Sequence, residues 1–361
     1  MSYQIGLDAV HLRPTPRLAH TEYCSSDALK RALGVTRSAF AGPQEQEGVR
    51  HSDEGDRCFE DLWDIDLIWH TNDGPVPWSR RGRVTDMGHA DFLEGGVDRR
   101  SGKPSPFKDA EDVLAFDAVK EYGKPDMQGL VAFYEQVYRD GQSRFPNQVY
   151  TAGYYKTIVS GAIEAFGWDM LLEAAAQPQR FERVLDSFFE LTLHHVKAWA
   201  STTAPVYIQH DDFVWSAGPF MNPDYYHKVI IPHYAELWKV LKSAGKKVLF
   251  CSDGDWSMFV GDIAEAGADG FIFEPMMALD PIVERFGRTH VIMGSKVDCR
   301  TLTFGSLHDI QREIDETLAL AMDCPGFMFA VGNHIPSNVP VEAAMFYMEH
   351  LRRNWWRAGA H

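Results

Sequence analysis

Side chains that can bind a metal or carry a proton recur along this chain, most densely after residue 200. Most of them directly follow a short apolar run, which gives them the same place relative to an expected strand. Thiolate, imidazole and carboxylate groups are the ligands of zinc, and the last two are common general acids and bases. We therefore expect metal-assisted or acid–base chemistry. The candidates are Glu22, His70, His210, Asp211, Asp212, Cys251, Asp253, Glu274, Asp298, Cys299 and His334.

The softest donors among these candidates predict the metal ligands. Cys251, Cys299 and His334 offer two thiolates and an imidazole, and three protein ligands suffice for a catalytic zinc that keeps one position open. We expect Cys251 and His334 to face one cavity, because both follow strands of the same expected sheet. We assign catalytic roles to His210, Asp212, Asp253 and Glu274, and substrate-binding roles to Glu22, His70, Asp211 and Asp298.

The same residues also have structural interpretations. His70 or His210 could be a hydrogen-bonded histidine at a strand end, and Asp211 or Asp212 could cap a loop or a helix. The sequence contains no H-E-x-x-H and no paired C-x-x-C pattern. It also lacks a P-loop, a G-x-G-x-x-G turn opening a helix and a G-x-S-x-G elbow, so ATP chemistry, hydride transfer and serine esterolysis have no sequence support.

Strands that end on one side of the molecule must position these residues. Short apolar runs alternate with amphipathic helical stretches and Gly-containing returns, which is typical of parallel βαβ units. Eight such strands can close into a barrel, whose site lies at the carboxyl ends of the strands. The predicted fold class is therefore an α/β (β/α)8 barrel, with a doubly wound open sheet as the alternative. The expected strands are 17–20, 67–70, 148–152, 204–209, 248–250, 271–273, 291–293 and 327–331.

Composition indicates one large domain covering residues 1–361. Hydrophobic residues make up 45% of the chain, which is enough for a large core. The stretch 74–124 has few apolar runs and many charges, so we expect a lid inserted over the barrel mouth. The net charge is −16 and no Lys/Arg-rich run occurs, which argues against nucleic acid binding. Without a signal-like N-terminus or an 18-residue apolar run, we expect a cytoplasmic protein that does not bind a membrane.

Several sequence strings resemble the uroporphyrinogen decarboxylase superfamily in order and spacing. The resemblance covers most of the chain, is strongest after residue 200 and implies a (β/α)8 barrel. The strings are HTEY at 20–23, AFGWDMLL at 165–172, HDD at 210–212, FCSDGD at 250–255, AGADGFIFEP at 266–275, GSKVDCRTLTFG at 294–305 and GNHIPSNVP at 332–340.

Within that superfamily the chain resembles the corrinoid-dependent methyltransferases more than the decarboxylases. The decarboxylases carry an Arg-rich motif near the first strand, where this chain has only Arg17. The methyltransferases hold zinc with a His-x-Cys motif after strand five and a Cys after strand eight. Here Cys251 and Asp253 stand at the first two positions and Asn333–His334 at the third. The resemblance thus implies a metal without fixing its identity, and Cys299 could supply the thiolate that Asp253 does not.

These observations lead to the hypothesis of a metal-dependent methyltransferase. It would move a methyl group between a small methylated substrate and a corrinoid, with zinc as the expected metal. No Asp-x-His-x-x-Gly segment is present, and a barrel with a lid uses nearly all 361 residues. We therefore expect the corrinoid to come from a separate corrinoid protein or from free cobalamin. The alternatives are a metal-free decarboxylase or lyase and a non-catalytic small-molecule binding protein.

Overall fold

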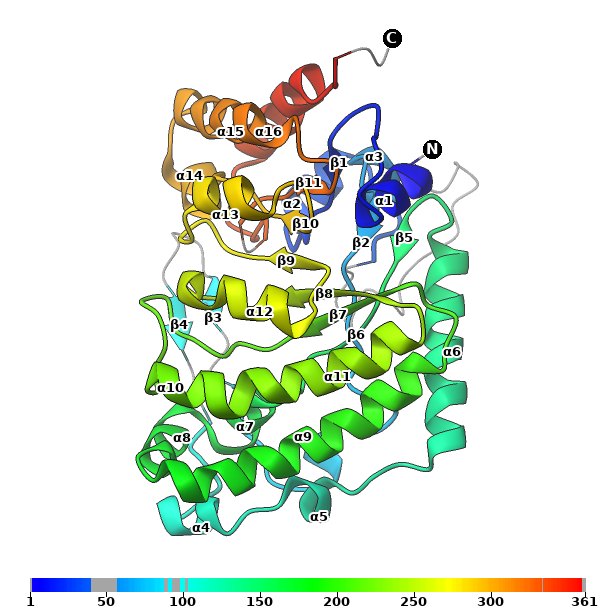
Figure 1. Cartoon of the computed structure of the whole chain (residues 1–361). Coiled ribbons are helices and arrows are strands. Elements are labelled where there is room, and N and C mark those ends of the chain that lie inside the picture. Colours follow the sequence, from blue (N-terminus) through cyan, green and yellow to red (C-terminus); the bar gives the residue numbers. More distant parts are fainter. Residues whose placement is uncertain are drawn as a thin grey trace.

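The computed structural model describes residues 2–39, 57–87, 90–92, 98–100, 103–332 and 334–358. Its centre is a barrel of eight parallel strand positions, the third of which is split into two segments (Figure 1). These strands are β1 (Ala19–His20), β2 (Leu67–Ile68), β5 (Val149–Tyr150), β6 (Ala152–Tyr154), β7 (Val206–His210), β8 (Lys247–Cys251), β9 (Gly270–Ile272), β10 (Val291–Met293) and β11 (Phe327–Phe329).

The pairing of these strands closes a ring. Seven of them follow one another in the order β1-β11-β10-β9-β8-β7-β6, and β2 pairs with β5. Only Thr151 separates β5 from β6, so the two form one strand position. Between β1 and β2, the Asp66 N–H donates to the His20 carbonyl at 2.8 Å. The predicted (β/α)8 barrel is confirmed, and all eight strands lie at their predicted places in the sequence.

Apolar side chains fill the inside of the barrel, as is usual for strands buried on both faces. Val206, Ile208, Leu249 and Met328 are fully buried in one cluster with residues of the N-terminal helix α1 (Ser2–Val10). This helix therefore closes the end of the barrel opposite to the carboxyl ends of the strands.

Helices surround the strands, and several neighbouring helices contact one another (Figure 1). Helix α11 (Ile231–Ser243) is preceded by a π-helical turn, Tyr226–Ile230. The sequence predicts a kink near this point because Pro232 has no N–H to donate. The other main helices are α2 (Asp27–Ala32), α3 (Phe59–Leu62), α6 (Met127–Arg144), α7 (Val159–Phe166), α8 (Trp168–Ala175), α9 (Pro178–Ala200), α10 (Pro223–Tyr225), α12 (Val260–Ala266), α13 (Leu279–Phe286), α14 (Cys299–Phe304), α15 (Leu307–Ala321) and α16 (Val341–Asn354).

The segment 74–124, which the sequence predicts to be a lid, contains several short elements. They are the 3-10 turn η1 (Trp78–Arg80), the antiparallel pair β3 (Ala90–Phe92) and β4 (Asp98–Arg100), and the helices α4 (Ala110–Leu114) and α5 (Ala118–Tyr122). Helix α4 contacts α8 and α9, and α5 contacts α9. The later part of this segment therefore packs on the outer helices, and its role as a lid stays a prediction. Within the described ranges, we find no helix long and apolar enough to cross a membrane.

Candidate active site at the barrel mouth

A cavity of about 400 Å³ opens at the carboxyl ends of the strands, a size within the range of small-molecule sites. Most of its wall residues lie at or shortly after the ends of β1, β2, β6, β7, β8 and β11. The described residues lining this main cavity are Tyr23, Ala39, Ile68, Trp69, His70, Thr71, Tyr155, His210, Asp253 and His334.

Three side chains at the edge of this cavity form a group that could hold a metal ion. His210, Asp212 and Asp253 each offer one nitrogen or oxygen atom, and these atoms lie within 4.8 Å of one another. His210 is the last residue of β7, and Asp253 follows β8, its neighbour in the sheet. Because both strands end at the barrel mouth, residues more than forty positions apart meet there.

The pair of His210 and Asp212 is held by several hydrogen bonds. The His210 Nε2 lies 3.0 Å from Asp212 Oδ1. Asp212 also accepts the Asp253 N–H at 3.0 Å and the Tyr155 hydroxyl at 2.9 Å. Burial alone would raise the pKa of Asp212, but His210 and these donors lower it to about 2. Burial would lower the pKa of His210, but Asp212 raises it, so the pairing favours the charged forms of both side chains.

The pKa of Asp253 is shifted in the opposite direction to that of Asp212. Burial raises its pKa well above the ordinary value, and the neighbouring carboxylates of Asp212 and Glu274 raise it further. The side chain nevertheless opens onto the main cavity. A nearby cation stabilises carboxylates that lie close together. This group therefore offers one imidazole nitrogen and several carboxylate oxygens to a divalent metal.

The backbone after β8 places Asp253 through a tight turn. The Gly254 N–H donates to Glu274 Oε2 at 2.9 Å. Gly254 has a φ of 84°, and a Cβ atom there would lie 2.5 Å from the Trp215 carbonyl oxygen. Only glycine fits this conformation and this close approach. Glu274, predicted as catalytic, thus contacts the loop that carries Asp253.

The structure does not bring the predicted metal ligands Cys251, Cys299 and His334 together as one group of three. Cys251 ends β8 beside a smaller cavity, His334 lines the main cavity, and Cys299 begins α14 and lines neither. Burial raises the pKa of Cys251 well above its usual value and that of Cys299 to about 12. Both thiols are therefore protonated at neutral pH in the absence of a metal.

Two predicted substrate-binding aspartates serve as helix caps here. Asp211 is fully buried, and its carboxylate accepts the backbone N–H groups of residues 158–160 at the start of α7 and the Tyr234 hydroxyl. Asp298 accepts the Arg300 N–H and caps α14. Neither residue lines the main or the smaller cavity. Asp211 therefore has the capping role that the sequence also allowed.

Glu22 and His70, also predicted to bind substrate, lie at the cavity walls. Glu22 lines the smaller cavity but is 3% exposed, and its oxygens accept the Val331 N–H at 3.1 Å and the Tyr347 hydroxyl. This carboxylate thus links β1 to β11 and α16. His70 lines the main cavity, and burial lowers its pKa to about 4, so its ring is neutral at neutral pH.

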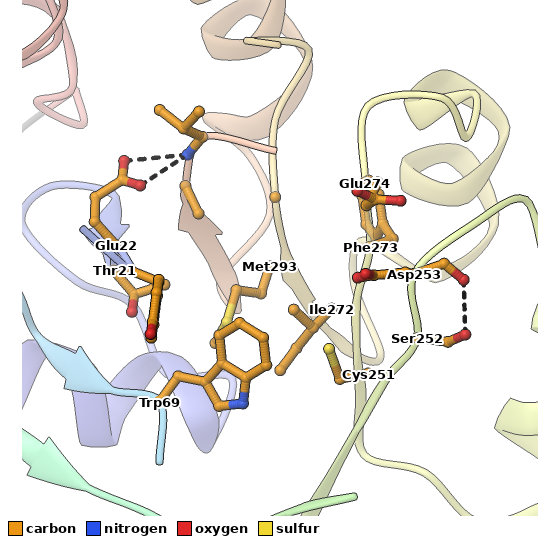
Figure 2. Close-up of a pocket in the computed structure, with 14 residues that line it drawn as sticks. Thr21, Glu22, Trp69, Cys251, Ser252, Asp253, Ile272, Phe273, Glu274 and Met293 are labelled. Atoms are coloured by element: carbon orange, nitrogen blue, oxygen red, sulfur yellow. Dashed lines mark hydrogen bonds between the residues drawn. The ribbon is translucent and has the colours of Figure 1, made fainter. Parts of the chain in front are cut away.

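The smaller cavity, about 30 Å³, adjoins the main one through Tyr23, Trp69 and Asp253, which line both. Figure 2 shows Trp69, Met293 and Cys251 gathered at its centre, with Asp253 and Glu274 at one side. Its volume suffices for one or two water molecules. It forms an apolar recess beside the acidic group.

Three aromatic residues of the main cavity escaped the sequence analysis. Tyr23, Trp69 and Tyr155 each follow the end of a strand, as the predicted site residues do. The signal was present, because these positions obey the same strand-end rule. They were missed because only titratable and metal-binding side chains were selected, and because the third strand was predicted to end at residue 152 and not at Tyr154.

Comparison with known proteins bears on this arrangement. The family model described as uroporphyrinogen decarboxylase matches residues 159–354. A uroporphyrinogen decarboxylase from Carboxydothermus hydrogenoformans is 26% identical over 172 residues, which are 48% of this chain and 47% of that relative. The match thus spans about half of the relative's length. A methyltransferase from Methanosarcina mazei has a similar structure, with a TM-score of 0.63, 15% identity and 98% of both chains covered. That likeness shows a shared fold.

Proposed function

Since the chain belongs to the uroporphyrinogen decarboxylase family, we propose that it is a metal-dependent methyltransferase. It moves a methyl group between a small methylated substrate and a corrinoid, which is supplied by a separate corrinoid protein or as free cobalamin. The observation that carries the proposal is the group of His210, Asp212 and Asp253 at the edge of a cavity of about 400 Å³.

The donor types of this group fit a divalent metal. One imidazole nitrogen and carboxylate oxygens suit zinc and other borderline or hard divalent ions. When bound, such an ion supplies Lewis-acid activation of the heteroatom that carries the methyl group. Asp212 orients the His210 ring through their hydrogen bond, and Tyr155 and the Asp253 N–H hold Asp212 in place. Trp69 and Tyr23 form cavity walls that position the substrate and exclude water.

The decarboxylation of an anionic porphyrinogen is not favoured. Gripping several carboxylates requires cationic side chains, and the described residues lining both cavities include neither Lys nor Arg. Arg17, near the first strand, is buried and makes two hydrogen bonds of 2.7 and 2.8 Å to Asp66. Its guanidinium group is used in this ion pair with Asp66, and the residue does not line either cavity.

Metal analysis of the purified full chain tests the ligand set. We expect about one divalent ion per chain, and a loss of affinity of about tenfold or more in His210→Ala and Asp253→Asn. Cys299→Ser is the matched control and should keep the metal, because Cys299 lies outside both cavities. Retention of metal in His210→Ala together with its loss in Cys251→Ser would favour the thiolate set instead.

Turnover tests the reaction. Metal-replete protein is mixed with reduced cobalamin and with methoxy, methylthio and methylamine compounds, and the cob(I)alamin absorption is followed. Conversion to methylcobalamin with at least one donor class is the expected result. No conversion with any donor, in either direction and with a cognate corrinoid protein present, would place the lyase hypothesis ahead.

A further inference from the structure

Side chains with rings dominate the wall of the main cavity. Six of its ten described lining residues carry a ring, and only Ala39 and Ile68 are aliphatic. Five of the six form a continuous series, which we call the ring belt. Successive ring centroids in it lie 5.7, 6.3, 5.4 and 4.3 Å apart. In order, the belt consists of His334, Tyr23, Trp69, His210 and Tyr155.

The rings of the belt surround the cavity and are not stacked on one another. Neighbouring rings are tilted by 82°, 64°, 47° and 42°. They lie at or shortly after the ends of β11, β1, β2, β7 and β6, so the belt follows the barrel mouth. Aromatic rings prefer offset and edge-to-face contacts. A flat ring inside the cavity can make both kinds of contact with the belt, whereas an aliphatic chain cannot.

The size of the cavity also favours a substrate with a ring. One water molecule takes about 30 Å³ of liquid volume, and the main cavity has about 400 Å³. A small donor such as methanol would leave most of this space unfilled. A substituted benzene ring fills a much larger part of it.

The proposed metal restricts the atom that carries the methyl group. A Lewis acid accepts a lone pair, so an ether oxygen or a thioether sulfur qualifies and an ammonium nitrogen does not. The metal group of one imidazole and carboxylates selects borderline or hard ions, which favour oxygen over a soft thioether sulfur. His210 belongs both to this group and to the ring belt. A ring bound in the belt therefore has its substituents close to the metal group.

We infer that the substrate of this site is an aromatic methyl ether, with its ring within the ring belt and its methoxy oxygen toward the metal group. Transfer breaks the bond between oxygen and the methyl carbon and forms a bond between that carbon and cob(I)alamin. The electron pair leaves with a phenolate, which then takes up a proton. Phenols have a pKa near 10, far below that of water at about 16, so a phenolate leaves more readily than an aliphatic alkoxide. This inference rests on the proposed function.

Binding to the purified full chain tests the ring preference without any corrinoid. The ligands are 4-methoxybenzyl alcohol and (4-methoxycyclohexyl)methanol, which share both substituents and differ in whether the ring is aromatic and flat. By isothermal titration calorimetry we expect the aromatic compound to bind at least about tenfold more tightly, since contacts with several rings add. Equal affinity for the two compounds, or no binding of the aromatic one at millimolar concentrations by folded protein, would overturn the inference.

Variants of one wall residue locate the ring of the substrate. Trp69→Leu should reduce the preference for the aromatic compound about fivefold or more, whereas Trp69→Phe should retain most of it. Trp215→Leu is the control, because Trp215 is 43% exposed and lines neither cavity. Equal losses of both ligands in Trp69→Leu, with Trp69→Phe no better, would contradict stacking in the ring belt.

A third ligand tests the ether oxygen. In 4-ethylbenzyl alcohol a methylene group replaces that oxygen, so metal-replete protein should bind it more weakly than 4-methoxybenzyl alcohol. Asp253→Asn should remove this difference and keep the preference for an aromatic ring. Equal binding of the two aromatic compounds by metal-replete protein would refute the ether.

These results are distinguishable from a failure of the proposed function. Methyl transfer from aliphatic donors by a protein with no preference for aromatic ligands would refute the aromatic ether alone. Selective binding of the aromatic ether without methyl transfer from any donor would refute the proposed reaction and leave the aromatic site.

Discussion

His195 is a buried histidine whose protonation would destabilise the fold. It lies on α9 and is 4% exposed, and its Nδ1 lies within hydrogen-bond distance, 2.6 Å, of the Tyr134 hydroxyl. Its ring stacks on Tyr154 at 4.5 Å. Burial lowers its pKa from 6.5 to about 3, with a smaller effect from nearby positive charge. The folded protein therefore keeps this ring neutral over a pH range in which the unfolded chain protonates it.

We predict a loss of stability on acidification that depends on His195. Its folded pKa lies below the unfolded value, so its contribution is complete above about pH 6.5 and is lost as the pH falls toward 3. As the pH falls, the free energy of unfolding should decrease by up to about 1.4 kcal/mol per pH unit from this group, most steeply below pH 6. In urea unfolding at pH 7, 6 and 5, His195→Gln should remove that part of the slope, and Tyr134→Phe should keep it. The same slope in His195→Gln would show that this ring is not the group responsible.

At the scale of elements, helix α1 closes the bottom of the barrel through a close backbone contact. Gly6 lies in the middle of this helix and is buried. A Cβ atom at this position would lie 2.2 Å from the Asp66 carbonyl oxygen and 3.2 Å from the Val149 side chain. Asp66 directly precedes β2, so the helix sits against the start of a strand and glycine is needed for its approach.

We predict that Gly6→Ala destabilises the protein although alanine favours helix. The new methyl group would collide with backbone, and relief requires a shift of α1, at about 1–3 kcal/mol of unfolding free energy. Gly129→Ala in α6 is the matched control, because Gly129 is exposed and its Cβ would meet only the Asp126 carboxylate at 3.4 Å. That variant should be neutral or up to about 1 kcal/mol more stable. Chemical denaturation measures the free energy of unfolding of both variants. Equal changes in Gly6→Ala and Gly129→Ala would show that the close contact at Gly6 does not limit stability.

At the scale of the whole molecule, a second apolar layer lies outside the barrel. Phe116 precedes α5, and its ring lies 5.1 Å from Phe166, 5.5 Å from Phe107 and 5.7 Å from Phe188. These rings join the segment 74–124 to helices α7 and α9. Part of the predicted lid therefore contributes to the packed core of the molecule.

We predict that Phe116→Ala lowers the free energy of unfolding by about 3–5 kcal/mol, as is typical for a buried Phe replaced by Ala. Phe116 is 7% exposed, whereas Phe304, the control, is 65% exposed. Phe304→Ala should change stability by less than about 0.5 kcal/mol. Equilibrium unfolding measures both. Full stability combined with loss of turnover in Phe116→Ala would indicate that the segment around it acts as a lid and not as core.

Sequence periodicity was sufficient for the architecture of this protein. Short apolar runs followed by amphipathic stretches locate all eight strands, because burial on both faces demands continuous apolar side chains over three to five residues. The strand-end rule then places His210, Asp253 and His334 at one mouth. Because the strands are parallel, the strand positions and the common location of the strand-end residues do not depend on the details of packing.

Only the tertiary structure decided which donors meet. Asp211 and Asp212 are neighbours in sequence and directly follow β7, yet the carboxylate of Asp211 caps α7 whereas that of Asp212 pairs with His210. Cys299 follows a strand but begins a helix that carries it away from the cavity. Side-chain direction and the course of each loop depend on contacts far apart in sequence, and no spacing in the chain encodes them.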